Sequence, residues 1–150
     1  MGADVNIENQ ANMTPLFMAV TEKNSFVNLM TCVLLNNGAK PDKGNDDGLT
    51  PLHKALTVGL DKPFVVEMVQ HCQTAETVNL KKRRGLPTPL MQAVTFGAPW
   101  VVRLLLDSGA DIFAYTRNEQ SVLHYAAATD NSTVIPLLLS TAKNLARRRF

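Results

Sequence analysis

The sequence predicts an all-α solenoid in which short helix pairs stack along the chain. One motif returns four times, and its copies start 36, 38 and 33 residues apart. A Gly-Ala turn follows in most copies, as in NNGAKPD at 36–42 and SGADI at 108–112. Because helix pairs this short bury too little apolar surface to offset their chain entropy, they are expected to stack on one another. The four copies are TPLFMA (14–19), TPLHKA (50–55), TPLMQA (88–93) and SVLHYA (121–126).

The motif predicts the first helix of each pair. Thr50 is a good N-cap because its hydroxyl can accept hydrogen bonds from the free amides of the first turn. Pro51 occupies the first helical position, where its missing amide loses no hydrogen bond. Leu52 and Ala55 lie three residues apart on one helical face, and the small Ala lets a neighbouring helix approach. Ser and Val replace Thr and Pro at 121–122, which predicts a weaker cap in the fourth copy.

A second helix is expected after a turn in each repeat. Pro63 and Pro99 stand near its start in the second and third repeats, and apolar residues follow. Gly38 and Gly109 are expected to end second helices in the left-handed conformation, which other residues adopt only at a cost. In the second repeat QTAET at 73–77 replaces the Gly-Ala turn, so an irregular exit is expected there.

This helix, turn, helix, turn unit, with TPLH near its start and GAD near its end, resembles the ankyrin repeat, whose usual period is about 33 residues. The resemblance extends from Gly2 to about Ala146. It implies that the turns between repeats project as β-turn or hairpin fingers beside a concave groove. It further implies one domain with approximate repeats at 9–44, 45–82, 83–115 and 116–150, preceded by the tail of another repeat at 2–8.

The two ends of the sequence lie inside the repeat pattern. The stretch GADVN at 2–6 matches the turn that ends a repeat, and a fifth repeat is expected to start at STAKNLARRRF (140–150). We therefore expect a segment of a longer array with exposed apolar edges, since solenoids need polar capping repeats for solubility.

Composition limits the class of protein. A hydrophobic fraction of 45% and a charged fraction of 19% are typical of a soluble globular domain. No apolar run approaches the roughly 18 to 20 residues that a membrane helix needs. Asn6 stands where a myristoylation signal requires Ser or Thr. Cys32 and Cys72 lie among apolar residues and are predicted to be buried free thiols in a reducing compartment, which favours the cytoplasm.

The histidines do not predict catalysis. His53 and His124 occupy the same motif position, where the other copies carry Phe17 and Met91. A catalytic or metal-binding role would not tolerate that exchange, whereas a His that braces a neighbouring turn would. His71 beside a single Cys does not make a zinc site, and nucleophile-elbow, phosphate-loop and CxxC motifs are absent from the sequence. The sequence predicts a protein without enzymatic activity, cofactor or metal.

The resemblance implies that a partner protein or peptide, rather than a small-molecule substrate, binds in the groove and at the finger tips. Candidate contacts are residues just before each motif and at the end of each first helix, because stacking does not require their side chains. They are Asp46, Asp47, Leu49, Thr57, Val58, Arg83, Arg84, Thr95, Phe96, Arg117, Asn118, Gln120 and Thr129.

The charge of these candidates changes sign along the array, from acidic Asp46 and Asp47 to basic Arg84 and Arg117, with Phe96 as the single aromatic residue. Arg and aromatic residues are common interface anchors. We hypothesise that Phe96, Arg84 and Arg117 form a hot spot for an acidic or amphipathic peptide segment. The alternative is that Phe96 packs against the next repeat and the arginines are solvated.

A cluster of four cations, KKRR, leaves a second function open. Such a cluster on an exposed finger can be read by a nuclear import receptor or can contact nucleic acid. Outside this cluster and RRR at 147–149, acidic residues outnumber basic ones, which argues against nucleic-acid binding. The predicted function is protein recognition, with nuclear import left open through Lys81, Lys82, Arg83 and Arg84.

Overall fold

A computed structural model describes residues 2–21, 26–59, 61–72, 78–79, 85–96 and 98–148. Over these ranges the chain forms helices but no β-strand, and an isolated bridge pairs Tyr115 with Ser121. This architecture confirms the predicted all-α repeat solenoid. The helices are α1 (Pro15–Thr21), α2 (Val27–Asn36), α3 (Pro51–Val58), α4 (Lys62–His71), α6 (Pro89–Thr95), α7 (Pro99–Asp107), α8 (Val122–Ala128) and α9 (Val134–Arg148).

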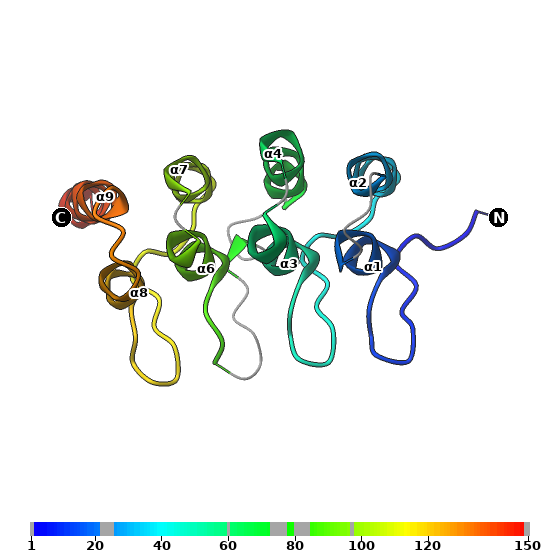
Figure 1. The fold of residues 1–150 in the computed structure, drawn as a ribbon, viewed down its shortest axis with the longest axis horizontal. Helices are drawn as coiled ribbons and strands as arrows, with labels where there is room; N and C mark the ends of the chain where they lie inside the picture. Colours follow the sequence, from blue (N-terminus) through cyan, green and yellow to red (C-terminus); the bar gives the residue numbers. More distant parts are fainter. Residues whose placement is uncertain are drawn as a thin grey trace.

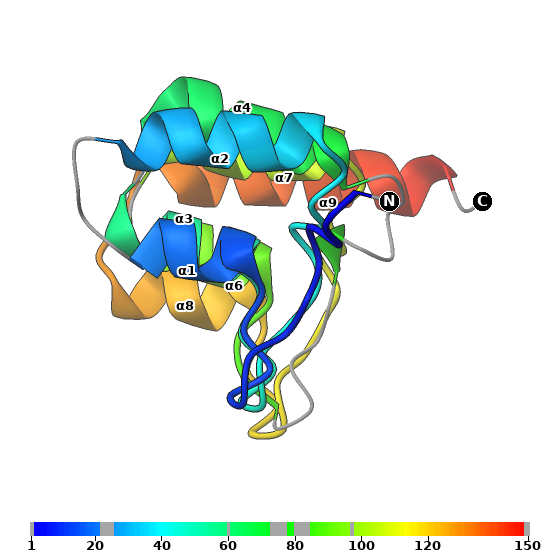
Figure 2. The ribbon, with the colours of Figure 1, turned by 90° about the vertical axis from the view of Figure 1, so that its right-hand side faces the viewer.

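The helices form two layers, as Figures 1 and 2 show. The first helix of each pair lies in one layer, where α1 contacts α3, α3 contacts α6 and α6 contacts α8. The second helices form the other layer through the contacts of α2 with α4, α4 with α7 and α7 with α9. Loops that precede the first helices project away from the second layer (Figure 1). We call these loops the fingers and the layer of second helices the outer layer.

The predicted caps start the first helices. Thr14, Thr50 and Thr88 each accept a hydrogen bond at the side-chain hydroxyl from the amide three residues later, at 3.2 to 3.3 Å. A Pro follows each of them at the first helical position. In the fourth repeat the Ser121 hydroxyl lies 2.9 Å from Nδ1 of His124, and the Ser121 amide donates to the same nitrogen at 3.1 Å. Local hydrogen bonds therefore define where each first helix begins.

Gly38 and Gly109 follow helices in the left-handed conformation, as predicted, and Gly59 does the same. Gly59 follows α3 with φ 69°, and Gly38 and Gly109 follow α2 and α7 with φ 86° and 90°. These are left-handed conformations in which a side chain would be strained. The irregular exit expected at 73–77 lies outside the residues that the structure describes.

The last helix corrects one expectation. Residues 140–148 belong to α9, so the start expected there for a fifth repeat was wrong, and these residues extend the second helix of the fourth repeat instead. Ala142 stands 33 residues after Gly109 and so occupies the equivalent position in the next repeat. Gly109 lies in the turn that ends α7, whereas Ala142 lies within α9. The residues after Ala142 are mostly Lys, Leu, Ala and Arg, which favour helix, and neither Gly nor Pro interrupts them up to Arg148.

The core lies between the two layers, and apolar side chains become more exposed at both ends of the stack. The motif leucines Leu52 and Leu90 are each 1% exposed, whereas the equivalent Leu123 on α8 is 40% exposed. At the other end, Leu29 and Met30 on α2 are exposed. No helix in the described ranges is long and apolar enough to cross a membrane.

The cysteines are less buried than predicted. Cys32 and Cys72 are free thiols, as expected, but both are half-buried. Cys32 lies on α2 in the outer layer, and its thiol donates a hydrogen bond to Oε2 of Glu67 on α4 at 3.0 Å. The apolar neighbours of Cys32 in the sequence predicted burial. That prediction was wrong because Cys32 faces Glu67 at the contact between α2 and α4 rather than the core.

Candidate protein-binding surface

Three fingers close with the same hydrogen-bond pattern. In each, a backbone amide donates to the carbonyl four residues later, and a side-chain oxygen of the same first residue accepts from that later amide. The side-chain acceptor is an Asn amide in two fingers and a Thr hydroxyl in the third. Local bonds thus fix the hairpin shape and leave the tips free to differ. The pairs are Asn9 with Met13 (3.1 Å), Asn45 with Leu49 (2.9 Å) and Thr116 with Gln120 (3.0 Å).

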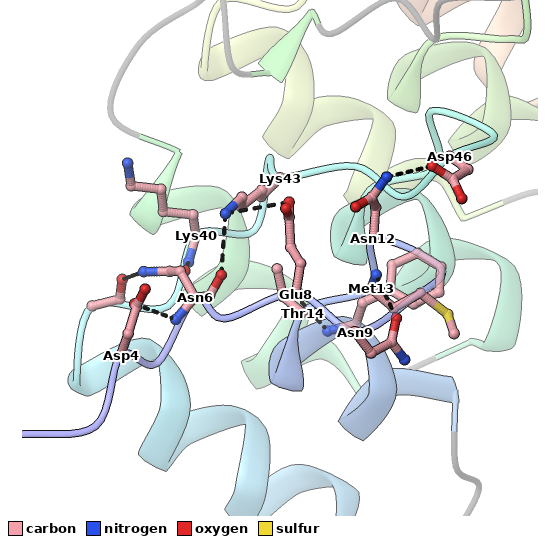
Figure 3. Close-up of polar contacts among 12 residues, drawn as sticks. Asp4, Asn6, Glu8, Asn9, Asn12, Met13, Thr14, Lys40, Lys43 and Asp46 are labelled. Atoms are coloured by element: carbon pink, nitrogen blue, oxygen red, sulfur yellow. Dashed lines mark hydrogen bonds and ion pairs between the residues drawn. The ribbon is translucent and has the colours of Figure 1, made fainter.

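Asparagines also join neighbouring repeats at the base of the fingers. The Asn6 side chain donates to the Gly38 carbonyl at 3.0 Å and accepts from the Lys40 amide at 2.9 Å, as Figure 3 shows for Lys40. Asn79 repeats this arrangement with Gly109 at 2.9 Å and Asp111 at 2.6 Å. Neither asparagine was predicted to join repeats, although Asn6 is the fifth residue of the GADVN turn and its position there is visible in the sequence.

The first two fingers touch through polar side chains (Figure 3). Asn12 donates from its amide to a carboxylate oxygen of Asp46. Lys43 forms an ion pair with Glu8 at 3.2 Å and donates to the Asn6 carbonyl at 3.1 Å. Asp46 and its neighbour Asp47 are nevertheless exposed. The second finger therefore presents two carboxylates, one of which is already oriented by the first finger.

Threonines at the ends of the first helices are held by their own helices. The hydroxyls of Thr57 and Thr95 donate to the carbonyls four residues earlier, at 2.9 and 3.0 Å, and both residues are exposed. Gln92 of α6 also donates to the Thr57 hydroxyl at 2.9 Å, which links two repeats. Thr129 makes the same type of bond to Tyr125 at 2.9 Å but is half-buried. Side chains that are already ordered lose little entropy when a partner binds.

The apolar candidates differ in exposure. Phe96 caps the C-terminus of α6 and is 51% exposed. Val58 is half-buried and packs against the core, and Leu49 is half-buried in the second finger. Phe96 is consequently the large apolar side chain among the candidates that a partner could cover.

The basic candidates lie in the third and fourth fingers. Arg117 is exposed, and its side chain crosses so close to Gly85 that a Cβ atom at Gly85 would overlap Cγ and Cδ of Arg117. Gly85 also has φ 73°, so both its conformation and this approach require glycine. Asn118 and Gln120 are exposed beside Arg117. Arg83 and Arg84, like Lys81 and Lys82, lie outside the described residues.

The structure does not bring Phe96 and Arg117 together. Phe96 ends α6, whereas Arg117 belongs to the finger that precedes the start of α8. Because fingers join the N-terminal ends of the first helices (Figure 2), the two residues stand at opposite ends of the surface along the helix direction. A ligand that touches both must cross a helix of seven residues, about 10 Å long.

The histidines have structural contacts. His53 is fully buried, with its Nδ1 2.7 Å from the Thr50 hydroxyl and 3.3 Å from the Thr50 amide. His71 places Nδ1 2.8 Å from the Glu67 carbonyl, one turn earlier in α4. Within the ranges that the structure describes, no three His, Cys, Asp or Glu side chains are grouped to hold a metal ion. The contacts of His53 support its predicted role as a brace at the start of its helix.

A family model described as ankyrin repeats (3 copies) matches residues 27–116 and 61–148. The chain is 32% identical over 143 residues to human SH3 and multiple ankyrin repeat domains protein 2, covering 95% of this chain and 7% of that protein. It is 31% identical over 112 residues to human transient receptor potential cation channel subfamily A member 1, covering 73% of this chain and 10% of the channel. It is 30% identical over 145 residues to the mouse B-cell lymphoma 3 protein homolog, covering 95% of this chain and 31% of that protein. The chain therefore spans less than a third of each of these relatives.

Proposed function

Because the chain belongs to the ankyrin-repeat family, whose repeats are general protein–protein interaction modules, we propose that it is a non-catalytic scaffold that binds a partner through its fingers and first helices. The proposed partner is a peptide segment or protein surface that crosses from the finger row to the C-terminal ends of the first helices. Phe96, an aromatic side chain left 51% exposed at the end of α6, is the observation that carries this proposal.

The contacts of the surface support a partner of mixed chemistry. An apolar side chain would cover Phe96, and an acidic group would pair with Arg117 in the fourth finger. The second finger offers Asp46 and Asp47, so a basic group of the partner fits there. An amphipathic segment with opposite charges at its two ends matches this order, and charge complementarity of this kind fixes the register of a bound segment.

Photo-crosslinking tests the location of this surface. We would place a photoreactive phenylalanine analogue at Thr57 or Thr95, and, as matched controls on exposed outer-layer positions, at Gln70 of α4 or Arg103 of α7. The proposal expects one partner to be crosslinked from the first two positions and not from the controls, with the linked peptide identified by mass spectrometry. Crosslinks formed mainly from Gln70 and Arg103 would place the binding surface on the outer layer and contradict the proposal.

A further inference from the structure

The fourth finger lays a charged side chain across the third. Arg117 directly follows Thr116, whose amide closes the fourth finger, and is therefore the first residue of its tip. A Cβ atom at Gly85 would lie 2.6 Å from Cδ and 2.8 Å from Cβ of Arg117 and would overlap Cγ. Carbon atoms that pack without overlap stand about 3.5 to 4.0 Å apart. The stem of Arg117 therefore occupies the space that a side chain at residue 85 would need.

The first two fingers show the same relation between neighbours. Asn12 of the first finger and Gly85 of the third have φ 52° and 73°, and each stands two or three residues before the cap of the next helix. Asp46, like Arg117, is the first residue of its fingertip, and the Asn12 amide donates to its carboxylate. In both pairs the left-handed residue of one finger contacts the charged tip residue of the next.

Positive φ does not set Gly85 apart from the other fingers. Asn12 and Glu119 adopt φ 52° and 56° at equivalent places although both carry side chains, which costs some strain. The stem of Arg117, which would collide with a Cβ atom, is what distinguishes the position of Gly85. The missing side chain at residue 85 therefore serves the placement of Arg117 as well as the backbone.

The placement of Arg117 suits the recognition of a carboxylate. Its contact with Gly85 is made by Cβ, Cγ and Cδ, so the guanidinium lies beyond the contact, and the residue is exposed. A guanidinium carries five N–H donors in a rigid planar fork that matches the two oxygens of a carboxylate. A long side chain that is already held in place loses less rotamer freedom when a partner binds.

We propose that Gly85 determines the specificity of the binding surface for an acidic partner. Its missing side chain lets Arg117 lie across the third finger, where the guanidinium receives an Asp or Glu carboxylate of the partner. Arg117 supplies the charge, and Gly85 is a positioning residue that acts through Arg117. This inference rests on the proposed protein-binding function.

Affinities for matched acidic and neutral peptides test this role. The probe is the partner peptide identified by photo-crosslinking, synthesised as found and with each Asp or Glu changed in turn to Asn or Gln. The unmodified chain is expected to bind the acidic peptide at least about tenfold more tightly than one of the amide variants, since hydrogen bonds to charged groups are the stronger ones. Gly85→Ala is expected to reduce that preference to about twofold or less, as Arg117→Ala does.

Gly38→Ala is the matched control for backbone strain. Gly38 has φ 86°, and a Cβ atom there meets no atom within 4 Å. Both alanine variants are expected to lower the Tm by roughly 2 to 8 °C, but only Gly85→Ala should lose the preference for the acidic peptide. A Gly85→Ala, Arg117→Ala double variant is expected to regain part of the Tm lost by Gly85→Ala, because it lacks Cγ and Cδ at residue 117.

The outcomes separate this role from the proposed function. Crosslinks from Thr57 or Thr95 together with an Arg117→Ala protein that keeps its preference would overturn the inference and leave the binding surface in place. Equal loss of preference in Gly85→Ala and Gly38→Ala would overturn it too, because strain would then be the cause. A double variant that regains no Tm would rule out the contact itself without any need of a partner.

The acidic group is checked separately. Phosphatase treatment of the partner is expected to leave its affinity unchanged. A loss of affinity after this treatment would show that Arg117 reads a phosphate and would overturn the carboxylate as the recognised group. Crosslinks formed only from the outer-layer controls would contradict both the proposed function and this inference.

Discussion

Thr50 joins the cap of α3 to a buried histidine. Its hydroxyl accepts from the His53 amide at 3.3 Å and lies 2.7 Å from Nδ1 of the same residue, and both residues are buried. Thr50→Ala removes both contacts and is expected to lower the free energy of unfolding by about 1 to 2 kcal/mol. Urea unfolding measures this loss. Thr50→Ser retains the hydroxyl and should recover most of the stability, so equal losses in the two variants would contradict the capping role.

Glu67 controls the acidity of Cys32. The hydrogen bond from the thiol to the Glu67 carboxylate, together with desolvation and the repulsion between carboxylate and thiolate, raises the pKa of Cys32 to about 11 from its ordinary value of 9.0. Because the thiolate is the reactive form, Cys32 is expected to react slowly with alkylating reagents at pH 8. Glu67→Gln should lower the pKa and raise the alkylation rate at pH 8 on the order of tenfold or more.

The alkylation rate is measured against pH in a Cys72→Ser background, so that one thiol reports. Asp61→Asn is the matched control, since Asp61 also contacts α2 but through Asn28. That control should leave the reactivity of Cys32 unchanged. An unchanged pH profile in the Glu67→Gln protein would show that the carboxylate does not set the thiol pKa.

Phe96 is the residue on which the proposed binding surface depends most. Phe96→Ala is expected to weaken binding to the crosslinked partner at least tenfold, because buried aromatic side chains at interfaces are frequent hot spots. Thermal stability should change little, since the ring is half exposed in the free protein. Isothermal titration calorimetry gives the affinity, and Leu29→Ala on the outer layer serves as the control that should bind normally.

Between neighbouring elements of the stack, the Asn79 side chain links two repeats. Its side chain bonds Gly109 and Asp111 across the repeat boundary at 2.9 and 2.6 Å. Asn79→Ala is expected to lower the free energy of unfolding by about 1 to 3 kcal/mol, the effect of two lost hydrogen bonds. Asn37→Ala removes a side-chain bond only within α2, to Val33, and should cost less. Equal losses in urea unfolding would mean that the link between repeats adds nothing.

The starts of the first helices could be predicted from the sequence, and the end of α9 could not. A Thr-Pro pair acts locally, so its effect on a helix start is visible in two adjacent residues. The length of α9 depends on the absence of a glycine. Ala142 stands where a glycine would stop the helix, and the residues beyond it continue the helix to Arg148. The repeat period alone predicted that a fifth repeat would start at 140–150.

At the scale of the whole molecule, the sequence predicted the stacking but not which side chains the stacking leaves available. Val58 and Phe96 occupy similar places at the ends of first helices, yet Val58 packs against the core and Phe96 is exposed. The exposure of Cys32 and the distance between Phe96 and Arg117 depend on how repeats lie against each other. Both features depend on contacts between residues far apart in the sequence, so the residue pattern of a single repeat does not predict them.

Hydrogen–deuterium exchange of the chain with its crosslinked partner would locate the binding surface, because it reports every face of the molecule in one measurement. We expect the partner to slow exchange in the finger hairpins at 45–49 and 116–120 and at the C-terminal ends of α3 and α6, while α4 and α7 exchange as in the free protein. Protection concentrated on α4 and α7, with the fingers unchanged, would contradict this expectation.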